Sequence, residues 1–383
     1  MATRRTFMAK SAVAAAATLL AAGCARIPRE APPRKLRCLG WQVGLTYQSM
    51  ASGGLDRDYL LRLLDEMAAN RMNTLSLMMQ SYGYFDPGHD GYAWPVRNPA
   101  LIPYRDPNAI NAQPDREFVR DIIEEAAARQ IEIQLFLNWG IWNPDFVKEA
   151  YPEASLQMKD DGTPSGWLHC PDAPGAWQLG LDEAADLLTF YDHPNVTGYA
   201  FERVSYAGFS TCYCPYTRKA FHEATGIALD DAGDRQREAW KTEQMSRYLS
   251  EFSAHIRKLR PGITIGLHTQ CRRGWGHDPA RLGQCGIDYL LPHTIQFPTT
   301  QPQLYAMLDT LAPNPCVLHF CTRDRRPQNY KLWIKTPEII DEVLGWVHDY
   351  PGSNLAGLLF FNEPATSPTN KEAVYQGIRR RFA

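Results

Sequence analysis

Short apolar segments alternate with longer amphipathic segments along the chain from Leu39 onward. The short segments are continuous runs of β-branched, aromatic and small residues, which is typical of parallel strands that are buried on both faces. We expect strands at 39–47, 73–79, 131–138, 196–202, 263–268, 287–293, 316–321 and 355–361.

The amphipathic segments predict helices between these strands. They lie at 55–70, 115–130, 179–191, 304–311, 337–350 and 370–381, with a longer helical region at 215–259 that is broken near 230–233. Eight strands, each followed by a helix or a loop, is the count of a (β/α)₈ TIM barrel. An open doubly wound sheet would show the same alternation, but no Gly-x-Gly-x-x-Gly turn follows the first strand. The pattern therefore predicts a single α/β domain, a (β/α)₈ barrel over residues 38–383.

The N-terminal segment has the features of an export signal. Arg4-Arg5 precedes an apolar run at 12–22, as in a twin-arginine signal peptide, and the sequence around Cys24 resembles a bacterial lipobox. Ala21 stands where a branched residue is usual, so an ordinary cleaved signal is the alternative. We expect residues 1–24 to be the signal peptide of a lipoprotein lipidated on Cys24, and residues 25–37 to be a tether. This predicts an exported protein of the cell envelope, in the periplasm or at the cell surface.

Charge and hydropathy exclude some classes of binding partner. The 383 residues carry a net charge of −2, which argues against a nucleic-acid partner. No apolar run after residue 24 is long enough to span a bilayer, so we expect membrane contact only through the lipid anchor. Export makes disulfides possible among the remaining cysteines, but the sequence does not give their connectivity.

Glu202 is the first candidate catalytic residue, because it follows a predicted strand of alternating character. Tyr199 and Phe201 share one face of that strand, and Gly198 and Ala200 share the other with Glu202. Catalytic groups of TIM barrels lie at the carboxyl ends of the strands. The structural alternative for Glu202 is an ion pair with a nearby basic residue.

Glu363 is the second candidate, at the end of the eighth strand. Neighbouring residues on a strand point in opposite directions, so only one of Asn362 and Glu363 faces the centre unless Pro364 turns the chain. Glycoside cleavage needs two carboxyl groups. With Glu202 and Glu363 across the mouth, a separation of roughly 6.5–9.5 Å would favour inversion, with Glu202 as general acid and Glu363 as general base.

Other polar and aromatic residues end the predicted strands or begin the loops after them. Aromatic rings that stack on sugar faces, beside amides that bind hydroxyl groups, favour a carbohydrate substrate. The predicted substrate-binding residues are Tyr47, Gln80, Tyr82, Asn138, Trp139, Arg203, His268, His293, His319 and Asn362.

Three of these residues also support a different interpretation. His268, His293 and His319 end consecutive strands and could share a metal with Glu202 or Glu363. A histidine at a strand end more often forms hydrogen bonds to a substrate or a backbone group, and no His-x-His pair supports the metal. We therefore predict no metal and no cofactor, with a metal-dependent barrel enzyme as the alternative.

Three stretches resemble the TIM-barrel glycoside hydrolases found among exported bacterial proteins. They are Trp-Leu-His-Cys-Pro-Asp at 167–172, the strand that leads to Glu202, and Cys-x-Cys-Pro-Tyr from Cys212. The resemblance implies that Glu202, on the fourth strand, is catalytic. Relatives often have a third cysteine where this chain has Thr217, so a metal-binding cysteine cluster is not implied. The seventh strand ends His319-Phe320-Cys321-Thr322, without the nucleophile that the large retaining clan has there.

The sequence thus predicts a glycoside hydrolase-like enzyme that cleaves an extracytoplasmic oligosaccharide by carboxylate general acid/base catalysis. Two other classes stay open. One is a metal-dependent TIM-barrel sugar isomerase or hydrolase, and the other is a non-catalytic lipoprotein that binds glycans at the surface.

Overall fold

Eight parallel strands close into a barrel in the order β1-β12-β11-β10-β9-β8-β5-β2. The computed structural model describes residues 35–45, 55–81, 91–138, 144–202, 205–206, 212–269, 275–292, 300–323 and 335–382. The barrel strands are β1 (Cys38–Gly44), β2 (Thr74–Met78), β5 (Glu132–Asn138), β8 (Val196–Glu202), β9 (Thr264–Thr269), β10 (Tyr289–Pro292), β11 (Cys316–Cys321) and β12 (Leu355–Phe361). The predicted fold class is confirmed.

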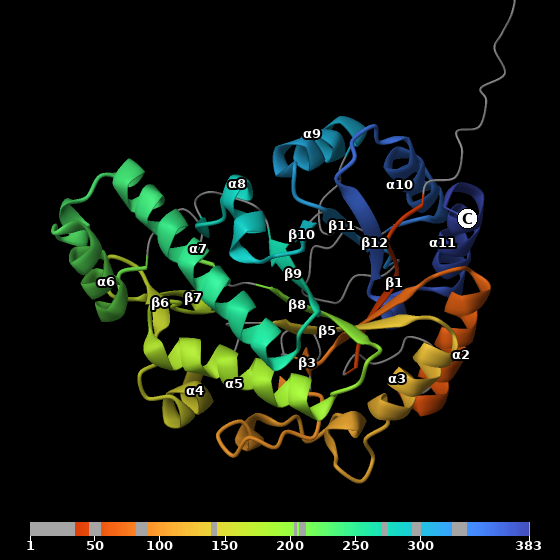
Figure 1. The fold of residues 1–383 in the computed structure, drawn as a ribbon, viewed down its shortest axis with the longest axis horizontal. Coiled ribbons are helices and arrows are strands. Elements are labelled where there is room, and N and C mark those ends of the chain that lie inside the picture. Colours follow the sequence, from red (N-terminus) through yellow and green to blue (C-terminus); the bar gives the residue numbers. More distant parts are fainter. Residues whose placement is uncertain are drawn as a thin grey trace, which may run out of the picture. The chain divides into compact units, whose positions relative to one another are not determined.

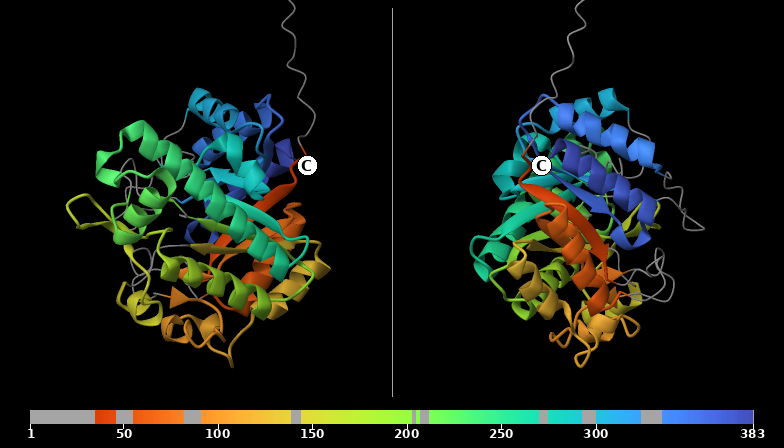
Figure 2. Two further views of the ribbon diagram at one scale, coloured as in Figure 1. Left: turned by 60° about the vertical axis from the view of Figure 1, so that its left-hand side comes forward. Right: turned by 90° about the vertical axis from the view of Figure 1, so that its right-hand side faces the viewer.

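Helices surround this barrel (Figure 1). They are α2 (Arg57–Ala69), α3 (Val119–Ala128), α4 (Pro144–Ala150), α5 (Pro174–Phe190), α6 (Pro215–Thr225), α7 (Asp234–Leu259), α8 (Pro279–Leu282), α9 (Gln301–Leu311), α10 (Pro337–Asp349) and α11 (Pro368–Arg381). Helices α10 and α11 lie side by side, and α2 lies next to α11 in the right-hand view of Figure 2. The long helical region predicted at 215–259 is α6 and α7, separated by the 3₁₀ turn η3 (Leu229–Asp231).

The pattern missed the short elements inside the loops. These are the two-stranded sheets β3 (Gln80–Ser81) with β4 (Gly91–Tyr92) and β6 (Leu156–Met158) with β7 (Pro164–His169), the helices α4 and α8, and the 3₁₀ turns η1 (Ile102–Tyr104), η2 (Ile110–Ala112), η5 (Gly283–Cys285) and η6 (Glu363–Ala365). They are too short to show a period. Strands β8, β11 and β12 match their predicted ranges to the residue.

The apolar core has two parts. The larger part lies between the strands and the helices, where Phe201 of β8 meets Phe252 of α7 with ring centroids 5.0 Å apart. The smaller part fills the barrel and consists of Met78, Phe136, Ala200, Leu291, Val317 and Leu359. The interior is not purely apolar, because Gln42, Ser76 and Gln134 are buried in the barrel strands as well.

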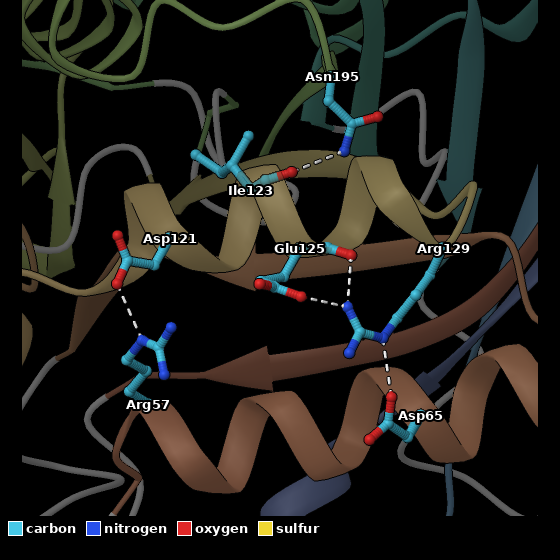
Figure 3. A network of polar contacts seen from close by, with 7 residues as sticks. All are labelled: Arg57, Asp65, Asp121, Ile123, Glu125, Arg129 and Asn195. Atoms are coloured by element: carbon cyan, nitrogen blue, oxygen red, sulfur yellow. Dashed lines mark hydrogen bonds and ion pairs between the residues drawn. The ribbon is translucent and has the colours of Figure 1, made fainter.

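Polar contacts on the outside link neighbouring βα units (Figure 3). Arg129 at the end of α3 pairs with Asp65 of α2 at 2.8 Å and with Glu125 at 2.6 Å. Asn195, just before β8, donates its Nδ2 to the carbonyl oxygen of Ile123 at 3.2 Å and to that of Ile131 at 2.9 Å. These two bonds hold the start of β8 against α3 and β5, and so help to fix the position of the strand that ends in Glu202.

Residues Arg34–Ala383 form one compact unit. The predicted signal peptide and most of the predicted tether lie outside the described residues, so both stay predictions. Within the described part of the chain, none of the helices combines the length and the apolar character that crossing a membrane requires.

Candidate active site

Glu202 lies inside the barrel at the carboxyl end of β8. Ala200 belongs to the interior cluster, whereas Phe201 packs outward against α7. The small residues on the inward face leave room for the Glu202 side chain, which is buried with 6% of its surface exposed. The alternation in the sequence predicts this inward orientation of Glu202.

A chain of buried polar side chains starts at Glu202. In the register of the sheet His268 lies opposite Glu202, and its Nδ1 contacts the carboxylate oxygen Oε2. His268 Nε2 is 3.3 Å from His319 Nδ1, and His319 Nε2 is 2.6 Å from Gln42 Oε1. We refer to Glu202, His268, His319 and Gln42 as the Glu202 chain. It runs from β8 through β9 and β11 to β1, beside the ring of Phe136.

Further polar contacts extend from Gln42 to neighbouring strands and show which of its amide atoms faces His319. Gln42 Nε2 donates to Ser76 Oγ at 3.4 Å, and Ser76 Oγ donates to Gln134 Oε1 at 2.7 Å. Gln134 in turn donates through Nε2 to the hydroxyl group of Tyr289. Since the amide nitrogen of Gln42 points toward Ser76, its oxygen Oε1 faces His319.

That direction determines how many protons the Glu202 chain holds. An amide oxygen only accepts, so Nε2 of His319 carries a proton. The contact between His319 and His268 needs one further proton, and the contact between His268 and Glu202 needs another. The three contacts thus hold three protons in total. Two neutral imidazoles and a carboxylate would carry two, so the extra proton makes the Glu202 chain neutral overall. Glu202 is therefore either a neutral acid with both imidazoles neutral, or a carboxylate with the positive charge on His268 or on His319.

Glu363 lies in a different environment. It begins η6 and is fully buried, and its Oε2 accepts a hydrogen bond of 2.6 Å from the hydroxyl group of Tyr59 on α2. Its Oε1 forms an ion pair with Lys371 on α11. Burial raises the pKa of Glu363 above its usual value, although Lys371 and the bond from Tyr59 act in the opposite direction. The general-base role stays a prediction, and the contacts described for this carboxylate come from the surrounding helices.

Asn362 directs its side chain toward β1. Its Oδ1 accepts a hydrogen bond of 3.2 Å from the backbone N–H of Gly44, the last residue of that strand. The side chain is fully buried, and among the described residues its Nδ2 has no hydrogen-bond partner. A buried donor without a partner costs stability, so it is suited to meet an oxygen of a bound molecule.

The remaining predicted residues fall into two groups. Gln80 is buried in β3, opposite Tyr92 of β4, and Asn138 is the register partner of Glu202 on β5. Outside the described residues are Tyr47, Tyr82, Trp139, Arg203 and His293, together with Cys24.

The metal alternative stays untested, because His293 lies outside the described residues. Both ring nitrogens of His268 and both of His319 are used within the Glu202 chain. A metal bound to either histidine would have to break one of these contacts. Gln42 is not among the predicted site residues, although a glutamine inside an otherwise apolar strand indicates a polar interior.

The likeness to solved structures concerns the fold. No protein-family model and no curated protein matches the sequence. The PgaB (BpsB) glycoside hydrolase domain from Bordetella bronchiseptica superposes with a TM-score of 0.66 at 13% identity, over 90% of this chain and 99% of that one. The β-galactosidase from Rahnella sp. R3 gives a TM-score of 0.59 at 15% identity, over 91% of this chain and 57% of that one. For Gan42B, a GH42 β-galactosidase from G. stearothermophilus, the TM-score is 0.57 at 12% identity, over 90% and 56% of the two chains.

Proposed function

We propose that this protein is a glycoside hydrolase that cleaves an oligosaccharide outside the cytoplasm, with Glu202 as the proton donor. The observation that carries the proposal is the buried Glu202 chain at the carboxyl end of β8, the end at which TIM barrels place their catalytic groups. The named glycoside hydrolases with the same fold, and the aromatic residues predicted for the loops, support a carbohydrate substrate.

The chemistry follows from the proton count. In the state in which Glu202 is protonated and His268 is neutral, Glu202 can give its proton to the leaving glycosidic oxygen, which is general acid catalysis. The Glu202 chain then carries one negative charge in a buried site. Because burial disfavours that charge, the chain takes up a proton again before the next turnover. His268 and His319 hold the carboxyl group in position.

The proposal for Glu202 does not depend on which group activates the attacking water. Inversion with Glu363 as general base remains the sequence-based expectation. The described contacts of Glu363 with Tyr59 and Lys371 do not include the Glu202 chain, so the proposal rests on Glu202 alone. Asn362 is the candidate donor to a substrate oxygen, because its buried Nδ2 has no partner among the described residues.

The test compares Glu202→Gln with the wild-type protein. Release of reducing ends is measured on a panel of oligosaccharides and aryl glycosides. On a substrate that the wild type cleaves, we expect the variant to lose about 10²–10⁴-fold in turnover, the range for a missing general acid. An aryl glycoside with a strongly acidic phenol as leaving group should recover much of this loss, because it needs little protonation.

Glu132→Gln is the matched control, since Glu132 is exposed at the opposite end of β5. It should retain wild-type turnover. A Glu202→Gln protein of normal activity would remove Glu202 from the mechanism. Wild-type protein that binds glycans but never cleaves them would favour the glycan-binding alternative.

A further inference from the structure

Three cysteines that are far apart in the sequence meet in the structure. Cys170 follows β7, whereas Cys212 and Cys214 precede α6. Their sulfur atoms all lie within 4.8 Å of one another, and all three side chains are buried. None of the three forms a disulfide. The resemblance in the sequence does not imply this cluster, because Thr217 stands where a further cysteine is expected.

Asp172 presents a carboxylate oxygen to the same place. Its Oδ2 is 3.7 Å from Cys170 Sγ, and its Oδ1 accepts hydrogen bonds of 3.0 Å from each of Tyr206, Gln244 and Tyr248. Tyr206 also donates to Oδ2 at 3.1 Å. The three sulfur atoms lie within 4.8 Å of one another, but Asp172 is outside that group, so its carboxylate has to turn toward Cys212 and Cys214 to complete a metal site. Hydrogen bonds of this kind orient a carboxylate that binds a metal.

Thr217 fills the space beside these groups. Its hydroxyl group donates to Asp172 Oδ2 at 2.5 Å. The same oxygen is 3.1 Å from Cys170 Sγ and 3.6 Å from Cys214 Sγ. Since a threonine hydroxyl is a weak zinc ligand and a carboxylate is a good one, Thr217 is better placed to orient Asp172 than to bind a metal itself.

Backbone N–H groups around the cluster point at its sulfur atoms. Cys212 Sγ accepts hydrogen bonds from the N–H of Met158 at 3.3 Å and from that of Cys214 at 3.4 Å. Cys214 is the N-cap residue of α6, where the positive end of the helix dipole stabilises a negative charge. The site thus combines three converging sulfur atoms with donors directed at them.

We propose that Cys170, Cys212, Cys214 and Asp172 bind one zinc ion in a closed tetrahedral site. Zinc bonds of about 2.3 Å to sulfur and about 2.0–2.2 Å to oxygen place tetrahedral ligand atoms about 3.5–3.8 Å apart. The distance of 3.7 Å between Asp172 Oδ2 and Cys170 Sγ already fits, and sulfur atoms within 4.8 Å need to move by no more than about 1 Å. The Asp172 carboxylate has to turn further, toward Cys212 and Cys214. Three soft thiolates select zinc over magnesium or calcium.

The site is structural and independent of the proposed function. All four ligands come from the protein, which leaves no open position for water or substrate. Two of the cysteines lie just after the segment that leaves Glu202, and Cys170 lies on the neighbouring connection between β7 and α5. Zinc would tie these two connections together at the end of β8.

Metal content is the first test. The full chain is produced with zinc in the medium, purified without chelator and analysed by plasma mass spectrometry. We expect about one zinc per chain, with loss of the metal in Cys212→Ser and retention in Cys316→Ser, a buried cysteine of β11 outside the cluster. Wild-type protein that contains no zinc and takes up none when zinc is added overturns the proposal. Discovery of a disulfide within the cluster overturns it as well.

A spectroscopic test identifies the ligands even if Cys212→Ser does not fold. Cobalt(II) in place of zinc should give thiolate charge-transfer absorption and the intense visible bands of tetrahedral geometry. Thr217→Cys should add a further thiolate to the charge-transfer absorption by displacing Asp172. Asp172→Asn should weaken zinc binding by more than the roughly 10–100-fold that loss of an outer-shell partner costs. Unchanged zinc affinity in Asp172→Asn would contradict Asp172 as a ligand, and a cobalt spectrum without charge-transfer bands would contradict thiolate ligation.

Discussion

At the scale of single residues, two glutamates at the ends of barrel strands have opposite surroundings. Glu202 points into the barrel and contacts a histidine, through which it can share a proton. Glu363 points toward the helices and contacts Lys371 and Tyr59. Both are buried, but Glu202 is linked to two histidines inside the barrel, whereas Glu363 is linked to a lysine and a tyrosine of the outer helices.

Glu363→Gln should change how stability depends on pH. The pKa of Glu363 is raised in the folded protein, so the native state holds this proton more tightly than the unfolded state. The stabilisation is fully present below the unfolded pKa of about 4.3 and is lost as pH rises through the raised pKa. Glutamine mimics the protonated form. We therefore expect the free energy of unfolding of the variant to rise relative to the wild type as pH increases from about 4.5, measured by denaturant unfolding across pH.

The same variant tests the sequence-based role of Glu363. A fall in kcat of about 10²–10⁴-fold in a folded Glu363→Gln protein would support the general base. Unchanged kcat, together with the altered pH profile, would assign Glu363 to the packing of α2 and α11 against the barrel. A parallel pH dependence in the two proteins would contradict the raised pKa.

At the scale of elements, helix α5 holds the loop that precedes α3. Asp186 on α5 accepts hydrogen bonds from the indole N–H of Trp94 at 2.7 Å and from the backbone N–H groups of Asn98 at 2.7 Å and Arg97 at 3.0 Å. One carboxylate thus satisfies three donors of a segment without regular secondary structure. This explains how the loop stays ordered although it offers no helix or strand of useful length.

Asp186→Ala should loosen this loop. We expect it to lower the free energy of unfolding by about 1–3 kcal/mol, since donors to a charged group lose their partner. Hydrogen exchange at the amides of Arg97 and Asn98 should increase, which mass spectrometry can follow. Asp192→Ala is the control, because Asp192 pairs with Arg260 at a position where its side chain is 82% exposed, and its loss should cost about 0–1 kcal/mol. Equal effects of the two substitutions would argue against the anchoring role of Asp186.

At the scale of the whole molecule, one barrel carries both the proposed active site and the proposed zinc site. The Glu202 chain crosses the interior from β8 to β1, whereas the cysteine cluster lies in the connections outside it. We therefore expect a substitution in the cysteine cluster to affect activity only by moving the polypeptide segment that follows Glu202.

Cys24→Ser tests the predicted attachment of the whole protein to a membrane. If Cys24 is lipidated, the wild-type protein should fractionate with membranes after cell lysis, and the variant should move to the soluble fraction. The comparison uses immunoblots of both fractions, with Cys38→Ser as a control outside the lipobox. An unchanged distribution of Cys24→Ser would remove the predicted anchor.

The sequence by itself determined the barrel and the orientation of the strand that ends in Glu202. Continuous apolar runs must be buried on both faces, and the period of two along β8 places Gly198 and Ala200 inside together with Glu202. These are local properties of the chain, so a single sequence contains them.

Only the tertiary structure decided which side chains meet. His268 is predicted as a substrate-binding residue, and the register of β8 against β9 places it against Glu202, a contact that the sequence did not predict. Cys170 joins Cys212 and Cys214 because the loops after neighbouring strands come together. Periodicity sets the face of each residue, but barrel closure and strand register set its neighbours, and neither of these is encoded in the local pattern.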